Sequence, residues 1–132
     1  MFEFINEAKN IAIVGLSPDE NKDSNMVASY LQKQDFKIYP IYPKMDEILG
    51  EKVYRSLNEI KDNIDIVVMF RKAEFAETLV DEVIQKGAKT LWLQLDIIND
   101  KAKEKALQNN INFVQNRCIK IEYMRLKDGF AE

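Results

Sequence analysis

The sequence predicts an α/β protein with three layers, α/β/α, built on a doubly wound parallel sheet. Five short apolar runs alternate along the chain with helix-like segments. Strands that are apolar along their whole length are buried on both faces, which is typical of a parallel sheet between two layers of helices. The first run ends in Gly15 and leads through a polar loop into a helix-like segment. The N-terminus of such a helix attracts anions, because its first N–H groups have no partner within the helix.

The order of the strands follows from the handedness of their connections. Right-handed crossovers place the first strand inside the sheet, and the chain changes direction after the second or third strand. A short segment at residues 56–60 links a minor strand at 53–54 to the third main run. The main strands are predicted at residues 11–14, 37–42, 64–70, 90–95 and 111–114.

Helical spacing and capping residues predict the helices. Residues 74–86 carry apolar side chains at helical spacing, and Gly87 follows as a C-terminal cap. Asn99 is a suitable N-cap for a helix that reaches about Gln108. The tail at residues 119–126 is expected to be a closing helix or an extended cover. The side chains expected on inner helix faces are Phe75, Leu79, Val83, Ile84, Ala102, Ala106 and Leu107.

Length and charge limit the class of protein. With 132 residues, 46% of them hydrophobic, the chain is expected to form a single domain, residues 1–132. The 22 acidic and 19 basic residues give a net charge of −3, which argues against a nucleic-acid binder. No apolar run approaches the 18 or so residues of a membrane span. We therefore expect a cytoplasmic protein with no membrane partner.

The counts of histidine and cysteine exclude several kinds of site. The chain has no histidine, which removes Ser-His and Cys-His nucleophile pairs and imidazole metal ligands. The single cysteine, Cys118, excludes an intrachain disulfide and a Cys-x-x-Cys metal site. Catalysis would have to use Asp, Glu, Lys, Tyr or Cys118, and we assign no catalytic residue and no metal ligand.

Polar and cationic residues follow the predicted strands, at the edge where doubly wound sheets bind ligands. Lysine and arginine side chains around a helix N-terminus form a pocket for phosphate groups. The candidate binding residues are Gly15, Leu16, Ser17, Lys22, Ser24 and Asn25 after the first run, Pro43 and Lys44 after the second, Phe70, Arg71 and Lys72 after the third, Gln94 after the fourth, and Arg117, between Asn116 and Cys118, after the fifth.

The loop sequences discriminate between phosphate ligands. A dinucleotide site would have Gly-x-Gly-x-x-Gly after the first strand and an acidic residue after the second. This chain has Gly-Leu-Ser-Pro-Asp-Glu, and Lys44 stands where the acidic residue would be. The P-loop pattern of nucleotide hydrolases is also missing. A lysine in place of the acid favours a ligand with an additional phosphate on its ribose, which leaves NADP or coenzyme A.

A series of motifs resembles a known family. In their order along residues 11–126, these motifs are similar to the small stand-alone CoA-binding domain proteins, which are related in fold to the CoA-binding domain of the succinyl-CoA synthetase α subunit. The motifs are Val14-Gly15-Leu16-Ser17, Lys22-x-Ser24, Ile41-Tyr42-Pro43-Lys44, Leu49-Gly50-Glu51-Lys52, Asp65-Ile66-Val67 with Phe70-Arg71, Gly87-Ala88-Lys89, Leu91-Trp92-Leu93-Gln94 and Asn116-Arg117-Cys118-x-Lys120.

The resemblance implies a Rossmann-like domain that binds coenzyme A. The glycine-serine loop and the next helix start would lie near the diphosphate, and Lys44 near the phosphorylated adenosine end. The turn at residues 70–72 and the segment around Gln94 would line the remaining nucleotide. Asp23 stands where the family often has a proline and Ala73 where it has a serine cap, which predicts a looser loop and a less well capped helix.

Several of these residues also have a structural interpretation. Gly15 suits a tight turn as well as close approach of a ligand. Ser24 is expected to cap the helix whether or not a ligand binds. Trp92 is expected in the core, and Gln94 needs a hydrogen-bond partner if it is buried. Cys118 is expected to be a packed thiol, or one that pairs with the thiol of coenzyme A, rather than a nucleophile.

Three functions remain open. The first is binding of coenzyme A, or of an acyl-CoA, without turnover. The second is an NADP-dependent reductase or CoA-thioester enzyme that uses Tyr42, Tyr123 or a carboxylate. The third is a CoA-responsive regulatory or oligomerising module, with a protein partner or a second copy on the exposed sheet edge and on the aromatic tail from Tyr123 to Phe130.

Overall fold

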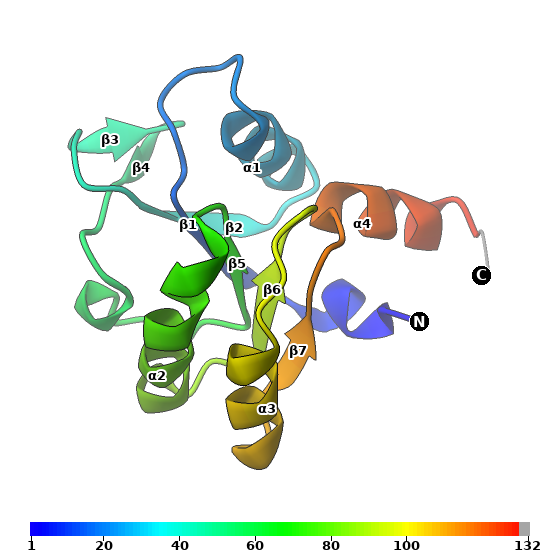
Figure 1. Cartoon of the computed structure of the whole chain (residues 1–132). Helices are drawn as coiled ribbons and strands as arrows, with labels where there is room; N and C mark the ends of the chain where they lie inside the picture. Colours follow the sequence, from blue (N-terminus) through cyan, green and yellow to red (C-terminus); the bar gives the residue numbers. More distant parts are fainter. Residues whose placement is uncertain (130–132) are drawn as a thin grey trace.

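Five parallel strands form the central sheet of the computed structural model, which describes residues 1–129 (Figure 1). The chain passes from β1 to β2 in one direction and then returns past β1 to β5, so the winding reverses after the second strand. This reversal confirms the predicted topology and puts the switch point between β1 and β5. In spatial order the strands are β2 (Lys37–Ile41), β1 (Asn10–Val14), β5 (Ile66–Met69), β6 (Thr90–Leu93) and β7 (Asn112–Val114).

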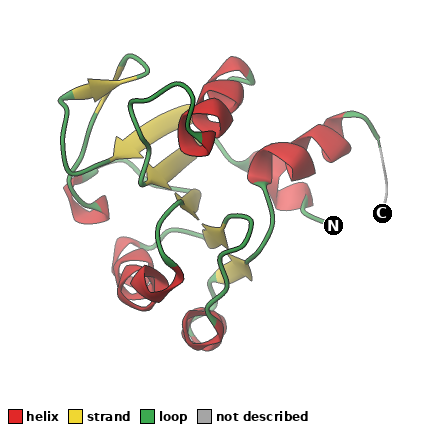
Figure 2. Cartoon of the chain, turned by 45° about the horizontal axis from the view of Figure 1, so that its top comes forward, coloured by secondary structure: helices red, strands yellow, loops and turns green. Residues whose placement is uncertain are grey.

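Helices cover both faces of this sheet, which confirms the three-layer α/β/α architecture (Figures 1 and 2). Side chains alternate along each strand, so that Ile11 and Ile13 pack on one face while Ala12 and Val14 pack on the other. The first face is covered by η1 (Glu3–Glu7), α1 (Asp23–Lys33) and α4 (Ile119–Lys127), and the second by η2 (Leu57–Glu59), α2 (Ala76–Lys86) and α3 (Asp100–Gln108).

The connection from β2 to β5 contains small elements. A two-stranded antiparallel hairpin joins β3 (Glu47–Ile48) to β4 (Glu51–Lys52). Tyr54 then makes an isolated parallel bridge to Ile41, the last residue of β2. The predicted minor strand at residues 53–54 is therefore reduced to this bridge, which still carries the chain along the outer edge of β2. A further short helix, η3 (Ala73–Phe75), leads directly into α2.

Two helix ends agree with the sequence. Gly87 has a φ of +78° in the left-handed region at the C-terminus of α2. The side chain of Asn99 accepts a hydrogen bond of 2.9 Å from the amide of Ala102 at the start of α3. Both caps form from local sequence alone, which explains why they could be predicted.

Two helix predictions were wrong. Leu107 was expected to point inward, but it is 55% exposed, because it lies about 100° around α3 from Ala106, which shares the buried face with Ala102. Ser24 was expected to be the N-cap of α1. The helix begins at Asp23 with Lys22 at the N-cap position, and the Ser24 hydroxyl instead accepts a hydrogen bond from the amide of Ser17.

The tail is the helix α4, which packs beside α1 and η1 (Figure 1). Tyr123 is half-buried, with its ring edge-on to Phe36 at 5.1 Å, so this part of the proposed partner surface belongs to the fold. Phe130 lies outside the described residues. No helix within residues 1–129 is both long and apolar enough to cross a membrane.

Candidate functional site

The loops after β1 and β5 touch at Gly15, at the carboxyl ends of the strands. Gly15 has a φ of +85°, and a Cβ atom built there would lie 2.5 Å from the carbonyl oxygen of Phe70. The Cδ atom of Arg71 lies 3.2 Å from the same position. Only glycine fits this contact without displacing backbone, so a structural requirement accounts for Gly15. The contact also marks the switch point, where ligands bind in folds of this kind.

Hydrogen bonds within the loop from Gly15 to α1 hold it in place. The amide of Ser17 donates to the Ser24 hydroxyl at 3.0 Å, and the Asn25 side chain donates to the carbonyl of Ser17 at 2.9 Å. Ser24 and Asn25 are buried for this purpose, and the Leu16 side chain is fully buried in the core. These side chains therefore shape the loop.

The first turn of α1 lacks a side-chain cap. Lys22, at the N-cap position, makes no side-chain hydrogen bond to the helix. The first amides of an α-helix have no acceptor within the helix, and the helix dipole adds positive potential there. Asp23 places one negative charge in this turn, which reduces that potential. The helix start can still donate hydrogen bonds to a phosphate group.

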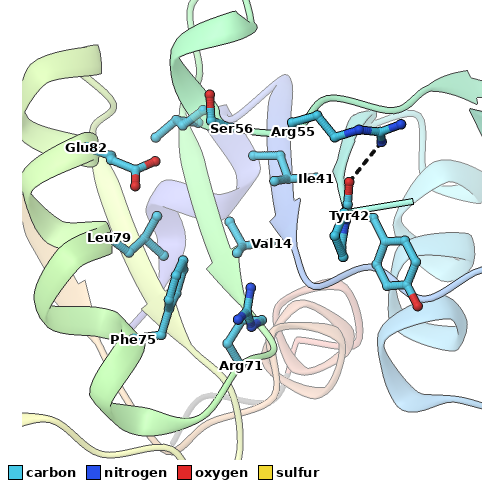
Figure 3. Close-up of a pocket in the computed structure, with 11 residues that line it drawn as sticks. Val14, Ile41, Tyr42, Arg55, Ser56, Arg71, Phe75, Leu79 and Glu82 are labelled. Atoms are coloured by element: carbon cyan, nitrogen blue, oxygen red, sulfur yellow. Dashed lines mark hydrogen bonds between the residues drawn. The ribbon is translucent and has the colours of Figure 1, made fainter. Parts of the chain in front are cut away.

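A small cavity of about 110 Å³ opens on the α2 side, beside the ends of β1 and β2 (Figure 3). Arg71 reaches into it, with its guanidinium carbon 4.3 Å from the centroid of the Phe75 ring. Pro43 and Arg55 also line it. The cavity thus combines the Arg71 guanidinium with the aromatic face of Phe75, which suits a flat, anionic ligand.

The sequence did not predict two charged residues that line this first cavity, Arg55 and Glu82. Arg55 donates to the carbonyls of Tyr42 at 3.0 Å and Lys44 at 3.1 Å, and so fixes the loop after β2 (Figure 3). Burial raises the pKa of the Glu82 carboxyl above its ordinary value, against a hydrogen bond from the backbone of Leu57. The minor strand before Arg55 was a usable signal, because an edge strand parallel to β2 ends at the same edge of the sheet.

A second hollow, of about 340 Å³, lies on the other face of the sheet, between the starts of α1 and α4. Phe70 and Gln94 line it from just after β5 and β6. Cys118, directly before α4, and Ile121, within α4, line it as well. Gln94 is only 4% exposed, and its side-chain oxygen accepts a hydrogen bond of 2.9 Å from the amide of Ile119. The expectation that a buried Gln94 needs a partner is confirmed, and that partner is the first turn of α4.

The predicted cations differ in their surroundings. Lys22, Lys44 and Lys72 are exposed on the three loops that follow β1, β2 and β5. Arg117 instead lies 3.3 Å from the carboxylate of Glu122, with its guanidinium over the ring of Phe2 at 5.3 Å. The structure therefore brings Arg71 to the switch point, whereas Arg117 is occupied with Phe2 and with Glu122 of α4.

Trp92 confirms its predicted core position. Its side chain is fully buried, and its indole N–H donates to the carbonyl of Arg117 at 2.8 Å. This bond fixes the backbone just before Cys118, on the wall of the second hollow.

Curated relatives match this chain over most of its length. The B. subtilis (strain 168) protein YneT is 33% identical over 121 residues, which cover 92% of this chain and 90% of YneT. The ADP-forming acetate–CoA ligase of Methanocaldococcus jannaschii is 31% identical over 140 residues, covering 98% of this chain but only 20% of the ligase. The chain thus spans about a fifth of that ligase's length.

Solved structures share the whole fold. A hypothetical protein from Pyrococcus horikoshii OT3 superposes with a TM-score of 0.92 at 38% identity, covering 96% of this chain and 89% of that one. A protein from Thermus thermophilus, cell-free ID.343, has a TM-score of 0.90 at 28% identity, with 95% of both chains covered. The family model described as a CoA binding domain matches residues 9–124. The chain therefore belongs to the CoA-binding domain family, as its motifs predicted.

Proposed function

We propose that this chain binds coenzyme A, or an acyl-CoA, through its phosphates across the carboxyl ends of the parallel strands. The observation that carries the proposal is the pair of hollows on opposite faces of the sheet, separated by the contact between Gly15 and Phe70. The uncapped start of α1 lies beside this contact. A long ligand with an anionic middle section suits such a path.

The charges indicate the direction of the ligand. The adenosine end suits the first cavity, where Arg71 lies against Phe75 and where Arg55 holds the loop that carries Lys44. The diphosphate suits the first amides of α1, and the pantetheine arm would then run toward the second hollow. Lys44 and Arg71 are the cations available to the 3′-phosphate, because the Arg55 guanidinium already donates to three carbonyls.

We propose binding without turnover. The chain has no histidine. The carboxyl group with a raised pKa, Glu82, lies in the first cavity, whereas Cys118 lies in the second, on the other face of the sheet. Glu82 is therefore not placed to act at the thiol end. The acetate–CoA ligase has a name that includes a reaction, but this chain matches only a fifth of that protein, so we do not propose the ligase reaction for it.

Titration calorimetry tests the proposal with coenzyme A, 3′-dephospho-CoA and NADP. Coenzyme A is expected to bind, and removal of the 3′-phosphate to weaken binding about tenfold or more, because a charged hydrogen bond contributes about 1.5–3 kcal/mol. NADP is expected to bind more weakly than coenzyme A. Absence of heat and of a thermal shift with millimolar coenzyme A would overturn the proposal.

A charge reversal tests the direction of the ligand. Lys44→Glu is expected to weaken coenzyme A binding, because it places a like charge near phosphate. Its matched control is Lys103→Glu, on the exposed side of α3, which should leave the affinity unchanged. Equal affinities for Lys44→Glu and the native chain would show that the adenosine end lies elsewhere.

A further inference from the structure

The second hollow is unusually apolar for a surface that water reaches. Large hydrophobic side chains with more than a third of their surface exposed gather there, namely Met26 (46%), Leu95 (52%) and Ile121 (42%). They come from three separate elements: α1, the loop after β6, and α4. An exposed apolar patch that is also concave indicates a binding site rather than chance exposure.

The hollow continues the path of the proposed ligand. Asp23, the first residue of α1, lies on its rim, and Phe70 on its wall directly precedes Arg71. A ligand whose diphosphate binds the start of α1 would therefore bring its far end into this hollow. This step rests on the proposed function.

We propose that the hollow binds an aliphatic acyl group, so that the preferred ligand is an acyl-CoA with about four to six acyl carbons. An apolar cavity of about 150 Å³ is enough to take up benzene, and this open hollow measures about 340 Å³. Its size therefore suits the end of the pantetheine arm together with a short hydrocarbon chain.

The charges at the hollow argue against a carboxylated acyl group. Its charged lining residues are Asp23 and Lys120, which have opposite signs. The Lys120 ammonium also lies over the ring of Tyr30, 5.3 Å from its centroid. A carboxylate would gain no net attraction here, and it would lose water against Leu95, Ile97 and Ile121.

Calorimetry with coenzyme A, acetyl-CoA, hexanoyl-CoA and succinyl-CoA tests the inference. Each fully buried methylene strengthens binding about fourfold. Since the hollow is open on one side, we expect hexanoyl-CoA to bind about tenfold tighter than acetyl-CoA, and succinyl-CoA to show no gain. If coenzyme A binds but hexanoyl-CoA binds no tighter than acetyl-CoA, the acyl site is wrong and the proposed function stands. If no ligand of the series binds, the proposed function fails, and the acyl site fails with it.

A matched pair of variants locates the effect. Leu95→Asn is expected to lower the ratio of hexanoyl-CoA to acetyl-CoA affinity, because Leu95 lines the hollow. Leu107→Asn removes a similarly exposed leucine, 55% exposed on α3, and should leave the ratio unchanged. Equal ratios in the two variants would place the acyl chain outside the hollow.

Discussion

At the scale of single residues, the contact between Gly15 and Phe70 makes a prediction about stability. Gly15→Ala combines a left-handed φ of +85° with a Cβ atom 2.5 Å from a carbonyl oxygen. The backbone conformation alone costs about 1–2 kcal/mol for a residue with a side chain. The clash should add to this, so we expect urea unfolding to show a loss above about 2 kcal/mol.

Gly50→Ala is the matched control for this glycine. Gly50 has a similar φ of +76°, but a Cβ atom there would meet nothing within 4 Å. Gly50→Ala should therefore lose only the stability that the left-handed backbone conformation costs, without a loss from a clash. Equal losses in the two variants would show that the strand-end loops move apart at no cost, and that Gly15 is needed for its φ alone.

Hydrogen-bond partners that are close in the sequence could be predicted, whereas partners that the fold brings together could not. Asn99 caps α3 through an amide three residues away, which the sequence displays. Ser24 accepts a hydrogen bond from Ser17 across a folded loop, and Arg55 reaches three carbonyls of another loop. Such partners are brought together only by the fold.

At the scale of elements, Asp65 joins the starts of three strands. Its carboxylate accepts hydrogen bonds from the amides of Lys9 at 2.8 Å and Asn10 at 3.0 Å, and lies 3.5 Å from the Lys89 ammonium. Burial opposes ionisation of this group. The two amides and Lys89 together outweigh that effect and hold the pKa of Asp65 below its ordinary value.

The sign of this shift predicts a pH-dependent variant. A depressed carboxyl pKa stabilises the fold above the unfolded value of about 3.9, and this stability is lost as pH falls through the folded pKa. Asp65→Asn should therefore cost about 1–2 kcal/mol at pH 7, and progressively less below about pH 4. Unfolding measured from pH 7 to pH 3 checks this, with the exposed Asp128→Asn as control. A loss that does not change with pH would assign the effect to packing instead.

The extents of the strands show where prediction from sequence stops. Apolar residues continue past the ends of the strands at Tyr42, Phe70 and Leu95, and the predicted runs included them. In the structure the sheet ends at Ile41, Met69 and Leu93, and the following residues turn outward into the two hollows. An apolar residue that lines a site looks like a strand residue in the sequence. The apolar runs therefore identified the carboxyl edge of the sheet, but not the hollows along it.

At the scale of the whole molecule, a ligand across the carboxyl edge should protect one end of the sheet only. Hydrogen exchange with and without coenzyme A is expected to slow at the loop and helix start of residues 15–25 and at the turns after β2, β5 and β6. Residues 63–65, at the amino ends of the strands, serve as the internal control. They lie at the opposite edge of the same sheet, where Asp65 bonds to the start of β1.

Bound ligand also stabilises the fold as a whole, so protection must be compared under conditions in which local opening dominates exchange. Slowing confined to the amino edge, or spread equally over both edges, would contradict a binding path over the switch point between β1 and β5.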